Sequence, residues 1–256
     1  MSDEDITRII RSLLEDVVSH EIQPVLTKLK QDQMDNRRIF RMMSEMVTGM
    51  EALSEIPDAV TVFGTARCRP QEDLYRTARH MGKRFAQEGY AVITGGGPGV
   101  MEAVNRGASE AGGISAGLNI ILPAEQEPNK YTNLKLMFRY FFIRKVMFVK
   151  YTRALVVLPG GFGTMDELFE SLTLKQTGKM RKYPIILFDS SYWGGLLEWL
   201  KERMVKEGFL TEGELGLLTI MDDPEEIVSA VDRYCQEQRA RKEPYVSYVE
   251  PEEFSL

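Results

Sequence analysis

A buried strand, a glycine-rich turn and a helix follow one another in the segment Ala154 to Glu170, ALVVLPGGFGTMDELFE. The first five residues are apolar and suit a strand that is buried on both faces. Pro159 to Gly163 form the turn, and a helical periodicity begins at Thr164. Glycines let the backbone approach a ligand closely, and the free N–H groups and dipole of a helix N-terminus favour an anion. The segment therefore predicts a turn that binds a phosphate.

The same alternation of strand and helix runs along the chain from Ala59. The predicted strands cover residues 59–64, 90–95, 113–122, 154–159, 183–189 and 215–222. The predicted helices cover residues 71–88, 99–111, 136–151, the stretch from 164 onward, 192–207 and 224–239. Strands joined by helical crossovers predict an α/β fold with a doubly wound, Rossmann-like parallel sheet. In the common strand order 3-2-1-4-5-6, ligands bind at the carboxyl ends of the first and fourth strands.

Three parts of the chain differ in composition. Residues 1–55 lack strand patterns and are predicted to be a helical extension, residues 56–240 a nucleotide-binding catalytic domain, and residues 241–256 a polar tail that lies on the surface or is disordered. The extension carries two apolar stripes: Ile6, Ile9, Ile10, Leu13, Leu14, Val17 and Val18, and then Ile39, Met42, Met43, Met46, Val47 and Met50. The sequence leaves open whether these stripes pack on the main domain or form a subunit interface.

Composition narrows the class of protein. The chain has 256 residues and a net charge of -6, which argues against a nucleic-acid-binding protein with a basic surface. Its two cysteines are too few and too far apart for a disulfide framework or a zinc site. The acidic start is unlike a secretory signal, and no run of about 18 apolar residues is present. We expect a cytoplasmic protein that does not enter membranes.

Glycine-rich loops follow the first, second and fourth predicted strands, at Gly64-Thr65, Gly95 to Gly99 and Pro159 to Thr164. The carboxyl ends of parallel strands share one edge of a sheet, so we expect these loops to converge. Neither the dinucleotide fingerprint G-x-G-x-x-G nor the Gly-Lys-Ser/Thr ending of a Walker A loop is present where it would be needed. Short loops of this kind suit a mononucleotide.

The charged residues near these loops each have two interpretations. Glu167 lies three residues after Thr164, as in a capping box, so local sequence leaves it either a cap or a functional group. Asp166 and Glu102 can likewise complement a helix dipole. The pair Arg144-Lys145 lies in an apolar helical segment, which favours a charge that reaches a cleft or a partner.

At this point the residues resemble a known family. Pro159 to Glu167 is similar to the PGGxGTxxE motif of the LOG family, the phosphoribohydrolases of cytokinin-type nucleoside 5′-monophosphates, also labelled "lysine decarboxylase-like". Arg144-Lys145 resembles the second motif of that family, and GGGPGVMEAVNRGA (95–108) and VFGTAR (62–67) resemble two further loops. The similarity spans roughly residues 59 to 230. Residues 1–55 resemble the N-terminal extension of the longer bacterial members.

The resemblance implies hydrolysis of an N-glycosidic bond, which releases the free base and ribose 5-phosphate. It implies that Glu167 and Arg144 are catalytic, with Glu167 stabilising the oxocarbenium character of the ribose and Arg144 fixing the substrate. The residues that it implies for substrate binding are Gly64, Thr65, Gly96, Gly97, Gly99, Glu102, Lys145, Gly160, Gly161, Phe162, Gly163 and Thr164. We expect no metal and no cofactor, AMP or an N6-substituted AMP as substrate, and a homo-oligomer, a dimer or a hexamer.

Two other functions are weighed against this expectation. A pyridoxal phosphate decarboxylase would need a lysine, commonly beside a histidine, and neither His20 nor His80 has a lysine neighbour in a glycine-rich or serine-rich loop. A noncatalytic carrier of a nucleotide or of the molybdenum cofactor would use a similar sheet. The presence of both Arg144 and Glu167 favours the enzyme.

Overall fold

The computed structural model describes residues 33–122, 127–180 and 183–240. The chain divides into two compact units, Met1–Thr48 and Gly49–Leu256. The second apolar stripe of the extension falls on a helix, α3 (Gln33–Ser54), as the periodicity predicts. The first stripe and the tail 241–256 lie outside the described residues.

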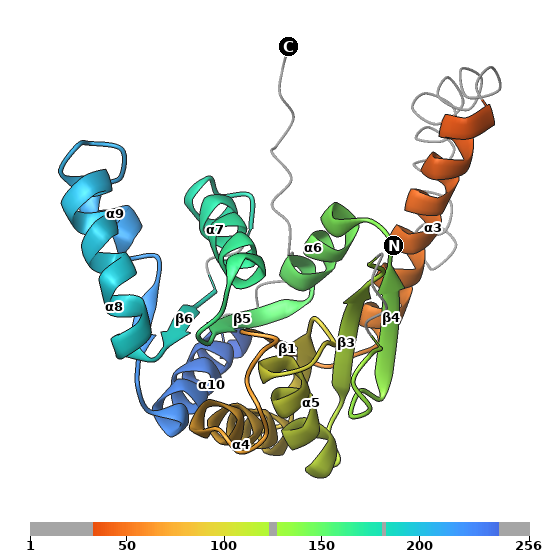
Figure 1. The fold of residues 1–256 in the computed structure, drawn as a ribbon, viewed down its shortest axis with the longest axis horizontal. Helices are drawn as coiled ribbons and strands as arrows, with labels where there is room; N and C mark the ends of the chain where they lie inside the picture. The colour runs from red at the N-terminus through yellow and green to blue at the C-terminus, as the bar shows by residue number, and fades with distance from the viewer. Residues whose placement is uncertain (1–32, 123–126, 181–182, 241–256) are drawn as a thin grey trace. The chain divides into compact units, whose positions relative to one another are not determined.

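Seven strands in the described part of the second unit form one parallel sheet (Figure 1). They are β1 (Ala59–Phe63), β2 (Ala91–Thr94), β3 (Ser115–Ile120), β4 (Leu134–Phe138), β5 (Thr152–Val157), β6 (Ile185–Phe188) and β7 (Thr219–Met221). Their order is β4-β3-β2-β1-β5-β6-β7. This is the expected order with β4 added at one edge, and it confirms the predicted fold class.

Helices cover both faces of the sheet, as a doubly wound fold requires. On one face, α4 (Asp73–Gln87), α5 (Val100–Glu110) and α10 (Pro224–Ala240) pack on β1, β2, β5 and β6 in a continuous apolar core. Figure 1 shows α6 (Phe141–Lys150), α7 (Phe162–Gln176) and α8 (Ser190–Trp199) on the other side. The central strands β1, β2 and β5 are buried along almost their whole length, which explains their aliphatic sequence.

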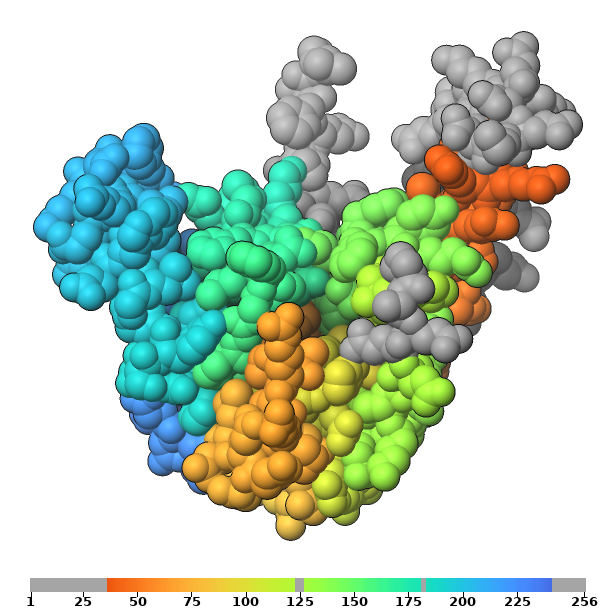
Figure 2. All heavy atoms as spheres, viewed as in Figure 1, coloured from red at the N-terminus to blue at the C-terminus, as the bar shows by residue number. Residues whose placement is uncertain are grey.

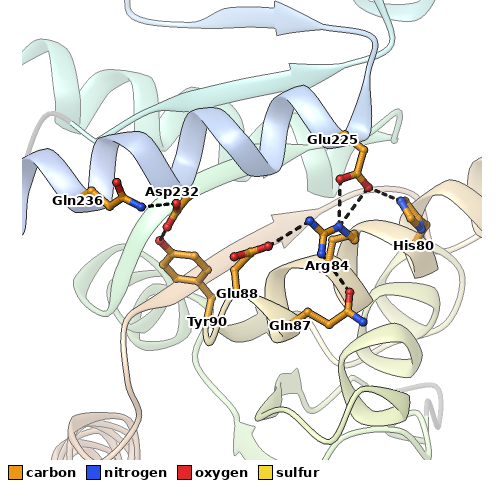
Figure 3. Close-up of polar contacts among 8 residues, drawn as sticks. All are labelled: His80, Arg84, Gln87, Glu88, Tyr90, Glu225, Asp232 and Gln236. Carbon is orange, nitrogen blue, oxygen red and sulfur yellow. Dashed lines mark hydrogen bonds and ion pairs between the residues drawn. The ribbon is translucent and has the colours of Figure 1, made fainter.

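Polar contacts join α10 to α4 at the surface of this core (Figure 3). The carboxylate of Glu225 accepts hydrogen bonds from the Arg84 guanidinium and pairs with the His80 ring (Nε2 to Oε1, 2.6 Å). Tyr90 directly precedes β2, and its hydroxyl donates a hydrogen bond to Asp232 Oδ1 at 2.8 Å. Burial raises the pKa of Tyr90 far above its usual range. These contacts hold the last helix of the described chain against the first half of the sheet.

The structure corrects one predicted helix, the segment 136–151. Its first residues belong to strand β4, which pairs with β3 in parallel, with Leu118 opposite Leu136. In β4 the side chains of Leu136 and Phe138 are buried while those of Lys135 and Met137 are exposed, the two-residue period of an edge strand. Few polar residues separate the apolar residues of β4 from those of α6, so the sequence pattern predicts a single helix here.

Two element boundaries near the C-terminus also differ from those predicted. The predicted helix 192–207 is α8 followed by a π-helical segment, η2 (Leu200–Val205). The predicted strand 215–222 is shorter in the structure: α9 (Glu212–Leu215), which begins with a capping box at Thr211, occupies its start, and β7 begins at Thr219.

Candidate active site

The loops that follow β1 and β5 meet at the carboxyl edge of the sheet. The two strands are parallel neighbours, with Phe63 opposite Val157. Beyond them the Thr65 N–H donates to the Pro159 carbonyl at 2.9 Å, and the Val100 N–H donates to the Thr65 carbonyl at 2.9 Å. In Figure 2 the orange segment after β1 lies against the green surface of the β5–α7 region. The predicted convergence of glycine-rich loops at the switch point is confirmed.

A cavity of about 740 Å³ opens at this meeting point. Nine of the residues expected in the site line it: Gly64, Thr65, Arg144, Gly160, Gly161, Phe162, Gly163, Thr164 and Glu167. Eight further residues line it that were not among the expected site residues: Phe63, Ala66, Arg67, Gly95, Met101, Phe148, Met165 and Tyr192. Six of them belong to the motifs quoted above, whereas Phe148 and Tyr192 lie outside every motif and were missed.

Five expected site residues do not line this cavity: Gly96, Gly97, Gly99, Glu102 and Lys145. Beyond Gly95, which lines the cavity, the loop after β2 packs against protein. A Cβ on Gly99 would lie 2.5 Å from the Thr65 carbonyl oxygen, so this glycine permits the close contact between the two loops. Glu102 accepts a hydrogen bond from the Tyr75 hydroxyl at 2.8 Å.

Lys145 points away from the cavity toward the acidic side of α7. Its Nζ lies 2.9 Å from Asp166 Oδ1 and 2.7 Å from Glu170 Oε2. Arg144 and Lys145 are consecutive on a helix, where neighbouring side chains point about 100° apart. Arg144 therefore faces the cavity, whereas Lys145 joins α6 to α7.

The helix α7 begins at Phe162, two residues earlier than predicted, and Gly161 is its N-cap. Of the two interpretations of Glu167, the capping box with Thr164 is wrong, because Thr164 is the third helical residue. The N-cap has no side chain, so none caps the first turn. The first N–H groups of an α-helix have no partner within the helix. In α7 these N–H groups lie beside the cavity and are suited to an anion.

Arg144 and Glu167 face each other across α6 and α7. Arg144 Nη2 lies 3.6 Å from Glu167 Oε1, and the two side chains are only 12% and 8% exposed. The Arg144 guanidinium lies over the rings of Phe141 and Phe148, 5.2 and 5.4 Å from their centroids. Its Nε is buried and has no hydrogen-bond partner among the described residues. Phe148 in turn packs edge-on against Phe63 of β1, so a rigid aromatic floor holds the arginine.

Burial dominates the electrostatics of this pair. It raises the pKa of the Glu167 carboxyl from 4.5 to about 7, although the positive charges of Arg144 and Lys145 offset part of the rise. Burial also lowers the pKa of the Arg144 guanidinium, which Glu167 opposes. A carboxyl group that exchanges its proton near neutral pH, in a cavity and beside a cation, has the properties of an acid–base or charge-stabilising group.

Two features are absent from the described residues. In this part of the chain no three histidine, cysteine or acidic side chains come together in a way that could hold a metal ion. None of its helices has the length and apolar character that crossing a lipid bilayer requires.

Fold and site together define a class: a doubly wound α/β protein with a helix N-terminus free of side-chain caps and a buried carboxylate–guanidinium pair at the switch point of its sheet. The family described as "Possible lysine decarboxylase" matches residues 101–231, just over half of the chain. The chain belongs to this family, the LOG family, as its motifs suggested.

Named relatives come from bacteria and plants. The cytokinin riboside 5′-monophosphate phosphoribohydrolase of Rhodococcoides fascians is 28% identical over 179 residues, which are 68% of this chain and 89% of that protein. A protein of the same name from Mycobacterium marinum is 27% identical, over 71% of this chain and 98% of its own. A probable enzyme of this name from rice, LOG4, is 27% identical over 66% and 74% of the two chains.

Solved structures share the fold. The molybdenum cofactor binding protein from Rippkaea orientalis superposes with a TM-score of 0.54 at 21% identity, covering 71% of this chain and 99% of that one. The molybdenum cofactor carrier protein from Chlamydomonas reinhardtii has a TM-score of 0.52 at 22% identity, covering 70% and 98%. At these identities the likeness extends to the fold alone.

Proposed function

We propose that the protein hydrolyses the N-glycosidic bond of a nucleoside 5′-monophosphate, with AMP or an N6-substituted AMP of the cytokinin type as substrate. The observation that carries the proposal is the buried Arg144–Glu167 pair, which lines the same cavity as the open N-terminus of α7. The same cavity then offers groups suited to a phosphate and groups suited to a reacting sugar. The names of the bacterial and plant relatives support the same reaction.

The 5′-phosphate would bind the turn between β5 and α7. Gly161 and Gly163 have open space where a side chain would be, so a ligand can reach the backbone there. The N–H groups at the start of α7 and the Thr164 hydroxyl would donate to phosphate oxygens. Binding energy from the phosphate, which is remote from the bond that breaks, would orient the ribose over Glu167.

The chemical step breaks the bond between C1′ of the ribose and a nitrogen of the base, and the bonding electrons leave with the base. Positive charge develops on C1′ and the ring oxygen, and the Glu167 carboxylate would stabilise it. A water molecule then adds to C1′ and loses a proton, for which Glu167 is the acceptor, and the departing base gains a proton. Arg144 would bind the ribose hydroxyls or the phosphate and hold Glu167 ionised.

The decarboxylation suggested by the description of the family fits this site poorly. Among the described residues, those that line the cavity include no lysine and no histidine. A pyridoxal phosphate enzyme needs a lysine to form the Schiff base. Lys145, the nearest candidate in the sequence, is paired with two carboxylates.

The remaining expected residues take indirect roles in this proposal. Gly96, Gly97 and Gly99 would hold the loop after β2 against Thr65, and Lys145 would fix α7 to α6. We also propose that the protein is a cytoplasmic homo-oligomer, a dimer or a hexamer, whose mass light scattering measures. We also propose that the chain divides by role into a helical extension (1–55), a nucleotide-binding catalytic domain (56–240) and a polar tail (241–256).

Incubation of the pure protein with AMP tests the function. We expect adenine and ribose 5-phosphate in equal amounts, measured by chromatography, and the same from an N6-isopentenyl AMP. Adenosine, which lacks the phosphate, should be cleaved far more slowly. If no nucleoside monophosphate loses its base but one binds tightly, or if the molybdenum cofactor binds, the protein is a carrier and the proposal is wrong.

A further inference from the structure

Tyr192 reaches the anion-binding turn from a different part of the chain. It lies on α8, which follows β6, and its side chain lines the cavity. The Tyr192 hydroxyl donates a hydrogen bond to the Gly160 carbonyl at 2.5 Å. This bond joins α8 to the turn between β5 and α7.

The start of α8 is built to hold Tyr192 in place. Asp189, the N-cap, has φ +86°, and it is the non-glycine residue with a positive φ in the described chain. Its side chain accepts hydrogen bonds from the backbone N–H groups of Ser191 and Tyr192, at 3.1 and 3.3 Å. The Tyr192 ring also packs edge-on against the fully buried Trp193, 4.9 Å between centroids. Strained backbone of this kind persists only where surrounding structure holds it, and it concentrates at functional sites.

The bond to Gly160 controls the direction of a peptide group. No described peptide bond is cis, and in a trans peptide the C=O and the following N–H point in opposite directions. Because the Gly160 carbonyl is fixed toward Tyr192, the Gly161 N–H at the cap of α7 is fixed as well. A carbonyl free to rotate toward a bound phosphate would repel its oxygens.

Tyr192 is not itself suited to bind the phosphate. A tyrosine hydroxyl carries a single proton, and the bond to Gly160 uses it. We propose that Tyr192 is a positioning residue for anion binding: it orients the Gly160–Gly161 peptide, and Asp189 orients Tyr192. The inference rests on the proposed function in taking the anion to be the 5′-phosphate of the substrate.

The variant Tyr192→Phe removes the donor and keeps the ring. A matched control is Tyr151→Phe, because the Tyr151 hydroxyl donates to the Met50 carbonyl at 3.1 Å and does not line the cavity. Calorimetry with inorganic phosphate and with ribose 5-phosphate gives the affinities, and initial rates with AMP give KM and kcat. We expect Kd and KM to rise about fivefold in Tyr192→Phe, the effect of one hydrogen bond of about 1 kcal/mol. We expect kcat within twofold of wild type, and no change of either constant in Tyr151→Phe.

Variants of Asp189 provide a second, independent test of the inference. Asp189→Asn keeps a side-chain acceptor and tolerates a positive φ, whereas Asp189→Ala does neither. We expect Asp189→Ala to weaken phosphate binding as Tyr192→Phe does, and Asp189→Asn to restore most of it. A general loss of stability would instead lower Tm without this difference in phosphate affinity among the variants that remain folded.

Several outcomes of these measurements would overturn the inference about Tyr192. The inference is overturned if Tyr192→Phe binds phosphate as wild type does, if it loses kcat with no change in phosphate affinity, or if Tyr151→Phe weakens binding equally. It is also overturned if the wild-type protein binds neither phosphate nor AMP. A wild-type protein that binds phosphate but cleaves no nucleotide refutes the proposed function alone, because the phosphate measurements still compare the variants.

Discussion

Arg144 Nη2 and Glu167 Oε1 are 3.6 Å apart, buried and of opposite charge, yet too far apart for a hydrogen bond. Charge-assisted hydrogen bonds between such groups are normally 2.7–2.9 Å long. The pair is therefore close enough for each charge to influence the other, while both groups keep hydrogen-bonding capacity for a ligand. The buried Arg144 Nε, which has no hydrogen-bond partner in the described part of the chain, is consistent with such a site.

Replacing Glu167 with Gln should abolish most of the activity and leave binding intact. The amide keeps the size of the carboxyl group but can neither accept a proton nor supply negative charge to the ribose. We expect kcat with AMP to fall on the order of 10²-fold or more, with a Kd for AMP within a few-fold of wild type by calorimetry. Normal turnover by a folded Glu167→Gln protein would show that Glu167 is structural only.

Replacing Arg144 with Gln should move the pH dependence of activity. The positive charge of Arg144 lowers the pKa of Glu167 from the value that burial alone would give. In wild type we expect kcat/KM to rise with pH and level off above about 7, where Glu167 is ionised. In Arg144→Gln the rise should shift to higher pH, whereas Arg144→Lys, which keeps the charge, should shift it less. An unchanged profile in Arg144→Gln would mean that Glu167 does not control it.

The raised pKa of Glu167 also predicts how stability depends on pH. The unfolded chain loses this proton near pH 4.5 and the folded protein near pH 7. Between these values the folded state binds more protons, so the free energy of unfolding falls as pH rises, by on the order of 3 kcal/mol from this group. Glu167→Gln has no carboxyl group at this position, so its free energy of unfolding does not fall with pH for this reason. Its Tm relative to wild type should therefore increase between pH 5 and pH 8.

Calorimetric scans at several pH values check this expectation. Glu198→Gln, at an exposed position on α8, controls for the loss of one carboxylate elsewhere. A Tm difference between Glu167→Gln and wild type that is the same at pH 5 and pH 8 would show that the pKa of Glu167 is not raised on folding.

Replacing Gly163 with Ala should separate stability from binding. A Cβ at this position in the first turn of α7 meets no atom within 4 Å, so the helix should gain up to about 1 kcal/mol. The methyl group would occupy space that the phosphate approaches, so KM for AMP should increase several-fold. Gly195→Ala, on α8 and equally open, should raise Tm without changing KM. Unchanged AMP affinity in Gly163→Ala would place the phosphate elsewhere.

The sequence predicts the framework of this site well, for a simple geometric reason. Parallel strands end on one edge of the sheet, so loops such as Gly64-Thr65 and Gly160-Gly161 had to converge once the strand order was known. The strands themselves followed from local patterns, because buried aliphatic strands and glycine turns have strong signals, whereas their order was taken as the common one of doubly wound sheets. The prediction was weaker where the apolar residues of a strand and of a helix are nearly continuous. For this reason β4 and α6 were predicted as one helix.

Other parts of the site depend on contacts that local sequence does not contain. Tyr192 reaches the turn only because β6 lies next to β5 in the sheet, and no glycine motif marks it. The roles of Arg144 and Lys145 differ because they occupy different sides of one helix turn. The start of α7 at Phe162 shows that a cap can be left free of side chains, and the capping-box pattern gave no warning of that.

The hydrogen bond between the Thr65 N–H and the Pro159 carbonyl has a consequence for how the protein is made. The two residues lie far apart in the sequence, so a ribosome must release much of the chain before the cavity can exist. If the proposed function is correct, a nucleotide can bind only after β5 has docked beside β1, and its binding would favour that docked state by mass action. The substrate would thus act as a late folding ligand, protecting the amide of Thr65 from exchange with solvent and stabilising the middle of the sheet rather than its edges.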